Sequence, residues 1–282
     1  MRPVRISEIS YTNVWPVYYY FETEGLEVEL IPQVPSQLNR GMAQGEIDLG
    51  PISSFAYGEA YPNYVILPNL SVSATGPVGS IFLFTKGKDL SELDGARIAL
   101  TNTSATSVNL LRILLERFEQ VKPTYLTMAP HLEKMMEQAE AALLIGDDAI
   151  RGSWHHHGYR IFDLGEEWHK RTGLSMTFAV WAVRREIAEQ RLPELERIYQ
   201  RFIEAKEKGK KDLEPVVNKA ISQVGGTREF WEHYFNGLNH DLGKDQIKGL
   251  KTYYQYATEL GLLKQEIEIC TLDLLASIST SV

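Results

Sequence analysis

Basic residues are scarce in this sequence relative to acidic ones. Its 282 residues carry 29 Lys and Arg against 37 Asp and Glu, a formal net charge of −8 at pH 7. A protein that binds nucleic acid needs a basic face, because much of its affinity comes from neutralising phosphates. Nucleic acid is therefore not an expected partner. The short basic stretch Lys206–Lys211 is interpreted as a solvated helix end that is broken at Gly209.

Cysteine and metal-ligand clusters are also scarce. Cys270 is the one cysteine, so neither an internal disulfide nor a thiolate metal cage can form, which fits a reducing compartment. Cys270 is interpreted as a buried structural thiol. The run His155–His157 does not predict a metal site, because adjacent side chains cannot point the same way on a helix or strand and no second ligand cluster accompanies them.

Long apolar runs are absent. No segment approaches the roughly 20 apolar residues that a membrane-spanning helix requires. The residues Met1–Ser10 lack the apolar run, roughly 7–15 residues long, of a secretory signal. We therefore expect a cytoplasmic protein without a membrane partner. The sequence leaves the oligomeric state open.

Several catalytic motifs are missing as well. The sequence contains no G-x-S-x-G nucleophile elbow, no phosphate-binding loop with its lysine and no G-x-G-x-x-G dinucleotide turn. These absences disfavour a serine hydrolase, a nucleotide hydrolase and a dehydrogenase. We expect no cofactor.

Short apolar runs alternate with helical patterns through the first two thirds of the chain. The alternation predicts an α/β fold with parallel strands. A helix is expected over Ala105–Phe118, because Val108, Leu111, Leu115 and Phe118 share one face. The runs expected to be strands are Val4–Ile9, Leu26–Ile31, Ile47–Gly50, Tyr64–Leu67, Ile81–Phe84, Arg97–Thr101 and Ala141–Ile145.

The last third of the chain has a different composition. Arg184–Val224 and Arg228–Leu263 are rich in Glu, Lys, Gln and Leu with helical periodicity, and are expected to be helical. Two apolar runs, Ile81–Thr85 and Thr177–Val183, bracket the middle segment and are interpreted as crossovers between two lobes. On this interpretation residues 1–85 and 177–282 form a discontinuous first lobe. Residues 86–176 form an inserted second lobe.

Small polar residues gather where strands are expected to give way to helices. Ligands of open α/β sheets bind at such places, where free N–H groups and the helix dipole favour carboxylates and phosphates. The same residues commonly serve as helix caps, and that alternative stays open. Asp147 and Asp148 are likewise either acid/base groups or caps. The four junctions are Ser10-Tyr11-Thr12-Asn13, Pro51-Ile52-Ser53-Ser54, Gly76-Pro77-Val78-Gly79-Ser80 and Thr101 through Ser107.

At these junctions the sequence resembles the menaquinone-biosynthesis family of the futalosine route, in particular its chorismate dehydratase branch. The sister branch opens with a Ser-Pro-Cys-Pro-Asn-Asp type segment that is absent here. The chain departs from the family pattern at Leu174-Ser175-Met176, which affects the expected pocket shape. The matching motifs, between about residues 5 and 184, are Ser10-Tyr11-x-Asn13-x-x-Pro16, Val34-Pro35-Ser36-x-Leu38-Asn39, Asp48-x-x-Pro51-Ile52-Ser53-Ser54, Gly76-Pro77-Val78-Gly79-Ser80, Ser104-Ala105-Thr106-Ser107, Leu144-Ile145-Gly146-Asp147 and Phe178-Ala179-Val180-Trp181-Ala182.

The resemblance implies a type II periplasmic-binding-protein-like fold, with two lobes around a cleft, followed here by the helical C-terminal region. It also implies a lyase that eliminates water from chorismate to give 3-[(1-carboxyvinyl)oxy]benzoate without a cofactor. A small-carboxylate receptor or sensor of the same fold is the alternative, because a fold does not dictate function.

The resemblance further implies which residues form the site. Asn13 and Ser80 are the expected catalytic pair. A substrate carboxylate is expected to take the proton, and Asp147 is the candidate if a protein base is needed. The residues expected to bind substrate are Ser10, Tyr11, Ser53, Ser54, Gly79, Ser104, Thr106, Ser107 and Asp147, of which Ser53, Ser54, Thr106 and Ser107 hold carboxylates.

Overall fold

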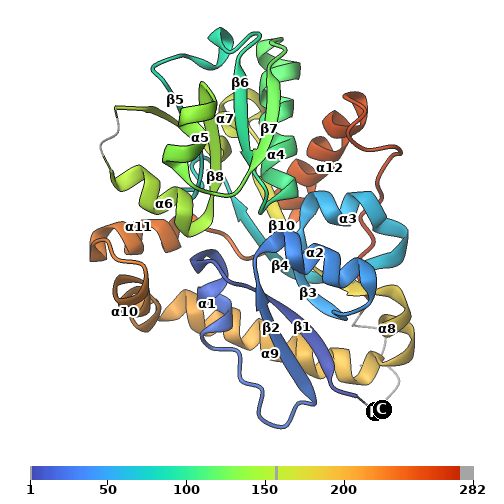
Figure 1. The fold of residues 1–282 in the computed structure, drawn as a ribbon. Helices are drawn as coiled ribbons and strands as arrows, with labels where there is room; N and C mark the ends of the chain where they lie inside the picture. The colour runs from blue at the N-terminus through green and yellow to red at the C-terminus, as the bar shows by residue number, and fades with distance from the viewer. Residues whose placement is uncertain (1, 156–157, 274–282) are drawn as a thin grey trace.

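Two five-stranded sheets form the framework of the protein in the computed structural model, which describes residues 2–155 and 158–273 (Figure 1). The first sheet has the order β2-β1-β3-β10-β4 and the second β7-β6-β8-β5-β9. The first contains β1 (Val4–Ile9), β2 (Val28–Gln33), β3 (Leu49–Ser53), β4 (Tyr64–Ala74) and β10 (Met176–Arg184). The second contains β5 (Ile81–Thr85), β6 (Arg97–Thr101), β7 (Thr124–Met128), β8 (Ala141–Ile145) and β9 (Arg160–Asp163).

Both sheets are mixed. The expectation of parallel strands holds for β1 with β2 and β3, and for β6 with β7 and β8. It is wrong for β10, which runs antiparallel to β3 and β4, and for β5, which runs antiparallel to β8 and β9. The reason is topological, because β5 and β10 are the strands through which the chain enters one sheet after leaving the other.

The chain passes between the sheets twice, once between β4 and β5 and once between α7 (Leu164–Thr172) and β10. The polypeptide therefore has two lobes, each built on one sheet. Ile81–Thr85, which was expected to close the first lobe, pairs within the second sheet. The lobe boundaries 1–85 with 177–282, and 86–176, stay a prediction.

Helices flank each sheet. The first lobe carries η1 (Thr12–Val14), α1 (Trp15–Tyr18), α2 (Pro35–Gln44), α3 (Ser54–Ala60) and η2 (Tyr61–Asn63). The second carries η3 (Leu90–Glu92), α4 (Ala105–Arg112), the π-helical segment η4 (Ile113–Glu119), α5 (Leu132–Gln138), α6 (Gly146–Trp154) and α7. The helix expected over Ala105–Phe118 thus forms, with a change of winding at Ile113.

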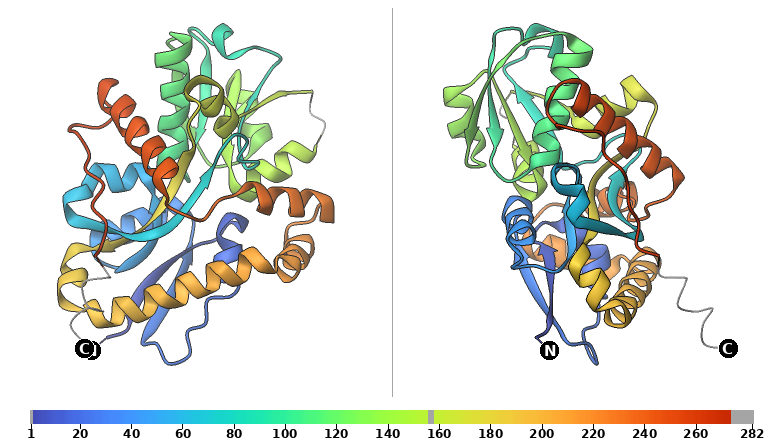
Figure 2. Two further views of the ribbon diagram at one scale, coloured as in Figure 1. Left: turned by 180° about the vertical axis from the view of Figure 1, so that it is seen from behind. Right: turned by 90° about the vertical axis from the view of Figure 1, so that its right-hand side faces the viewer.

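The C-terminal region is helical, as expected. It contains α8 (Arg185–Gln190), α9 (Leu192–Lys211), α10 (Glu214–Gln223), α11 (Arg228–Gly237) and α12 (Lys244–Glu259). Figure 2 shows α9 running along the first lobe, whereas α12 stands beside both lobes. Accordingly, Tyr256 of α12 lies under Arg117 of η4, with 3.9 Å between the guanidinium carbon and the ring centroid.

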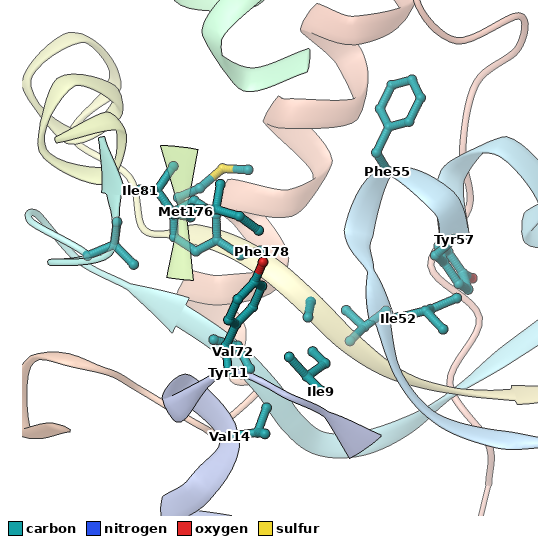
Figure 3. Packing of buried hydrophobic residues seen from close by; sticks show 14 of the residues in the cluster. Ile9, Tyr11, Val14, Ile52, Phe55, Tyr57, Val72, Ile81, Met176 and Phe178 are labelled. Atoms are coloured by element: carbon teal, nitrogen blue, oxygen red, sulfur yellow. The ribbon is translucent and has the colours of Figure 1, made fainter. Parts of the chain in front are cut away.

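One hydrophobic core continues from the first lobe into the second. It includes Tyr11, Ile81, Ile145, Met176 and Phe178, several of which Figure 3 shows around the crossover strands. Because this core is continuous, the two lobes are closed against each other. Within the described ranges, no helix combines the length and apolar character needed to cross a membrane.

Candidate functional site

The turn after β1 is bonded to the start of α6 in the other lobe. The backbone N–H and hydroxyl of Thr12 both donate to Oδ1 of Asp147, at 3.2 and 2.7 Å. The N–H of Gly146 donates to the carbonyl of Ser80 at 2.7 Å. These bonds bring together the β1–η1 turn, the crossover loop between β4 and β5 (residues 75–80) and the β8–α6 junction.

The two lobes also approach each other closely at Gly146. This glycine has φ +58°, and a Cβ atom there would lie 2.5 Å from Cγ of Tyr11. Glycine is required at this position for two reasons, because the backbone is left-handed and the Tyr11 ring occupies the side-chain volume.

A second contact between the lobes joins α3 and α4. The hydroxyl of Thr106 accepts from the N–H of Phe55 at 3.0 Å, and its carbonyl accepts from the hydroxyl of Tyr253 at 3.1 Å. Beside them, the N–H of Ser36 donates to the carbonyl of Thr103 at 3.1 Å. The junctions that follow β3 and β6 are therefore in direct contact.

Helix capping accounts for part of the polar chemistry at this second contact. Ser53 caps α3 by accepting from the N–H of Ala56 at 3.2 Å, and Asn39 bonds both its N–H and its hydroxyl. Ser104 caps α4 by accepting from the N–H of Ser107 at 3.2 Å. The capping alternative is thus confirmed at Ser53 and Ser104.

Other buried polar atoms have no such partner. Within the described ranges, the buried side-chain atoms without a hydrogen bond are the hydroxyls of Tyr11 and Tyr234, Oδ1 of Asn13 and Nε1 of Trp181. Three of these four belong to segments that line the first contact between the lobes. Buried polar atoms are nearly always paired in native proteins, so each of these groups stands out as one whose partner the described residues do not supply.

Burial governs the electrostatics around these atoms. It raises the pKa of the Tyr11 hydroxyl to about 12, so this group is a neutral hydrogen-bond donor at pH 7. Burial also raises the pKa of Asp147, although the two bonds from Thr12 favour the charged form. The pKa of neighbouring Asp148 is raised by burial too, against the opposing charge of Arg151.

Two residues that the sequence did not single out hold the site segments in place. Asp163 caps α7 and also accepts from the N–H groups of Val78 and Gly79, at 3.0 and 2.7 Å. His240 is 5% exposed and its Nε2 lies 2.7 Å from the carbonyl of Asn13. An aspartate between a short strand and a helix is a capping signal that could have found Asp163. No comparable signal marks His240.

All the expected site residues except Ser10 lie at one of the two contacts between the lobes. Tyr11, Asn13, Gly79, Ser80 and Asp147 lie at the first contact between the lobes. Ser53, Ser54, Ser104, Thr106 and Ser107 lie around the second. Ser54 donates its hydroxyl proton to the carbonyl of Thr177 at 2.8 Å, and Ser10 is exposed.

No cluster of three metal-binding side chains occurs in the part of the chain that the structure describes. His156 and His157 of the histidine run lie outside the described residues. Cys270 carries a free thiol and is half-buried rather than fully buried.

The fold is that of the periplasmic binding proteins. An X-ray structure of a protein from Archaeoglobus fulgidus superposes with a TM-score of 0.75 at 20% identity, covering 93% of this chain and 98% of that one. The periplasmic aliphatic sulphonate-binding protein of Escherichia coli gives 0.68 at 15% identity, covering 95% and 91%. Similarity at this level establishes the two-lobed architecture.

The family follows from the sequence comparisons. Residues 4–259 match the family model described as menaquinone biosynthesis, and the chain belongs to that family. The chorismate dehydratase of Thermus thermophilus is 33% identical over 277 residues, or 93% of this chain and 97% of that protein. The 1,4-dihydroxy-6-naphtoate synthase of the same organism is 26% identical over 229 residues, or 80% and 81%.

Proposed function

We propose that this protein is a chorismate dehydratase that acts in the cytoplasm and forms 3-[(1-carboxyvinyl)oxy]benzoate for menaquinone biosynthesis. The observation that supports it most is the set of unpaired buried atoms on Tyr11, Asn13 and Tyr234 between the lobes. The similarity to a chorismate dehydratase over nearly the whole chain adds to this support.

The two contacts between the lobes suit the two ends of such a substrate. At the second contact α4 presents its N-terminus beside the hydroxyls of Thr106 and Ser107, a setting that favours a carboxylate. We assign Ser53, Thr106 and Ser107 to the substrate carboxylates, whereas the hydroxyl proton of Ser54 is already donated to the carbonyl of Thr177. At the first contact, the hydroxyl of Tyr11 and Oδ1 of Asn13 are free to bond the substrate where its ring carbons react.

The elimination needs little from the protein beyond positioning and hydrogen bonds. The proton on C3 leaves, its electron pair becomes the C3–C4 double bond, and the C4–O bond breaks with its pair on the departing hydroxide. Proton and hydroxide together make one water, and the enolpyruvyl ether at C3 stays intact. Formation of the aromatic ring drives the reaction.

We assign Asn13 and Ser80 to the place where charge develops. Ser80 is 2% exposed and lies on the crossover loop. Its carbonyl accepts a hydrogen bond from the N–H of Gly146, which fixes the backbone there. Asn13 is fixed through its own carbonyl by His240. Both side chains are therefore held on rigid backbone, which is the arrangement that preorganised stabilisation of a leaving group requires. A carboxylate of the substrate is assigned as the acceptor of the C3 proton.

The decisive experiment incubates purified protein with chorismate and follows the products by liquid chromatography and mass spectrometry. We expect time- and enzyme-dependent formation of a species lighter by one water, with no free pyruvate in a coupled lactate dehydrogenase assay. A reaction without enzyme corrects for spontaneous decay of chorismate. Chorismate deuterated at C3 is expected to lose its label in the product.

Two outcomes would overturn the proposal. Free pyruvate with 4-hydroxybenzoate would indicate a different lyase reaction, and retained deuterium would exclude this elimination. A receptor would bind chorismate stoichiometrically, raise the unfolding temperature and return the ligand unchanged. Binding of that kind without turnover, in correctly folded protein, would replace the proposed enzyme by the small-carboxylate receptor.

A further inference from the structure

Tyr234 is a buried residue of α11 that lies outside the motifs of the strand–helix junctions. Its side chain is 4% exposed, and its hydroxyl has no hydrogen-bond partner among the residues that the structure describes. A buried hydroxyl left in this state costs free energy, on the order of 1–3 kcal/mol, unless something else pairs with it.

α11 is anchored against the second lobe. The ring of Trp154 in α6 packs edge-on against Phe230 and Trp231, with centroid separations of 5.2 and 6.1 Å. The indole of Trp231 donates to the carbonyl of Gly225 at 2.7 Å, which fixes the loop before the helix. Figure 1 shows α11 directly beside α6. The C-terminal region thus contacts α6 of the second lobe through this helix.

The ring of Tyr234 packs onto the crossover loop next to Ser80. A Cβ atom placed on Gly79 would lie 3.0 Å from Cδ2 of Tyr234, so the aromatic ring sits against bare backbone. The N–H of Gly79 is bonded to Asp163 at 2.7 Å, which holds the loop in this position. Gly79 therefore leaves room for the Tyr234 ring at the edge of the proposed site.

The surroundings keep the Tyr234 hydroxyl protonated. Burial raises its pKa above the usual value for tyrosine, and the charges of Asp147 and Asp163 act in the same direction. The hydroxyls of Ser80 and Thr12 are near enough to oppose this effect on the pKa, although neither forms a hydrogen bond of normal geometry with Tyr234. At pH 7 the group is a neutral donor beside Ser80.

We propose that Tyr234 is a further catalytic residue, whose hydroxyl donates a hydrogen bond to the oxygen that leaves C4 of the substrate. The assignment rests on the proposed dehydration. The C4–O bond breaks with its electron pair on oxygen, the hydrogen bonds of Tyr234 and Ser80 spread that charge, and the oxygen departs as water with the proton taken from C3. Tyr234 ends the cycle unchanged.

The test replaces the hydroxyl alone, in the variant Tyr234→Phe. We expect kcat to fall by about 10²-fold, the effect of losing one donor to a developing oxyanion. KM should change less than threefold, because the contact strengthens in the transition state rather than in the ground state. The unfolding temperature should stay the same or rise slightly, since the hydroxyl has no partner in the unliganded protein.

The matched control is Tyr57→Phe. Tyr57 is also fully buried, but its hydroxyl donates to the carbonyl of Glu268 at 2.9 Å and accepts from the N–H of Cys270 at 3.0 Å, both in the C-terminal segment. This variant should lose thermal stability while keeping kcat. The opposite pattern in the two variants would support the assignment.

Two failures are distinguishable. If the unchanged protein makes no dehydrated product, the proposed function is wrong. If it does so and Tyr234→Phe turns over at the same rate, Tyr234 is a packing residue and the inference is wrong. A variant that loses stability and turnover together would also contradict the assignment, because it would show that the hydroxyl supports the fold.

Discussion

Of the two contacts between the lobes, only the first has buried side-chain atoms that the described residues leave unpaired. Around α3 and α4, Ser53 and Ser104 accept helix N–H groups and Ser54 donates to Thr177, so the fold itself uses these side chains. Around the β1–η1 turn and the crossover loop, Tyr11 and Asn13 keep buried polar atoms that no described residue satisfies. Similar sequence motifs precede both contacts.

The difference separates binding from catalysis. The Ser104 cap keeps the N-terminus of α4 rigid. A rigid helix N-terminus is suited to holding a carboxylate in both the ground state and the transition state. Unpaired buried groups cost stability in the free protein, and a site retains them where a ligand or transition state supplies the missing partner. Variants at the two contacts should therefore change different measured quantities.

The largest effect is expected for Asn13→Ala and Ser80→Ala. Each should lower kcat by about 10²–10³-fold, because each removes a hydrogen-bonding group where charge develops. Loss of stability should be small in comparison, as Oδ1 of Asn13 has no partner within the described fold. Steady-state kinetics and thermal unfolding measure the two effects separately. Normal turnover with lowered stability in both variants would show that these residues only shape the turn.

The next effect is a dependence of folding stability on pH, caused by His240. Burial lowers the pKa of His240 to about 4, with Lys206, Lys210 and Asp241 as the neighbouring charges. The unfolded chain binds a proton near pH 6.5. The folded protein therefore loses stability as pH falls from 6.5 to 4, by about 3 kcal/mol for this group.

His240→Gln removes this titration and keeps a donor for the carbonyl of Asn13. We expect the variant to show a flatter stability curve than the unchanged protein between pH 4 and 6.5, measured by urea unfolding. Buried carboxyls such as Asp147 titrate in both proteins and cancel in the difference. Curves that run parallel would mean that His240 is not the buried neutral group that holds the β1–η1 turn.

A smaller effect is expected at Asp147. Variants there distinguish two roles of this residue, a general base in the reaction and a hydrogen-bond acceptor that links the lobes. Asp147→Ala leaves two donors of Thr12 without their partner, a cost of about 1–3 kcal/mol. Asp147→Asn keeps an oxygen for Thr12 but cannot act as a base. If the substrate carboxylate takes the proton, Asp147→Asn should keep kcat within about tenfold. A general base would contribute roughly 10²–10⁴-fold, so a larger loss would identify Asp147 as the base.

The sequence predicted several of the strands that carry buried aliphatic residues. Val4–Ile9, Arg97–Thr101 and Ala141–Ile145 match β1, β6 and β8 residue for residue, because each carries buried aliphatic residues of the kind enriched in strands. The strands β7 and β9 were missed. They lie at the edges of the second sheet and consist mostly of exposed and half-buried residues, which weakens the apolar signal.

The site was predictable only in part. Asn13 and Ser80 belong to motifs at strand ends, which physical rules and the family resemblance both indicate. Tyr234 sits in an amphipathic helix among Phe230, Trp231 and Phe235, and nothing in the local sequence separates it from the aromatic residues that form the core. Its unpaired hydroxyl is a property of how α11 meets the crossover loop.

The smallest effect is expected at Ser104, which caps α4 at the second contact between the lobes. This serine accepts from the N–H of Ser107 and donates to the Ser107 hydroxyl at 3.0 Å. Ser104→Ala should cost about 1 kcal/mol of stability through loss of the α4 cap. It should also raise KM for chorismate, because a frayed first turn no longer holds its N–H groups toward the carboxylate.

Ser104→Asn separates these two roles, since asparagine caps a helix as well as serine does. If Ser104 acts only by keeping the first turn of α4 rigid, the asparagine variant should recover both the stability and KM. If the serine hydroxyl itself contacts the substrate, stability should recover while KM stays raised. In neither case should kcat fall as it does for Asn13→Ala, because a carboxylate held equally in ground and transition state contributes to binding rather than to turnover. A fall in kcat comparable to that of Asn13→Ala would remove the distinction between the two contacts and place the reacting carbons nearer to α4.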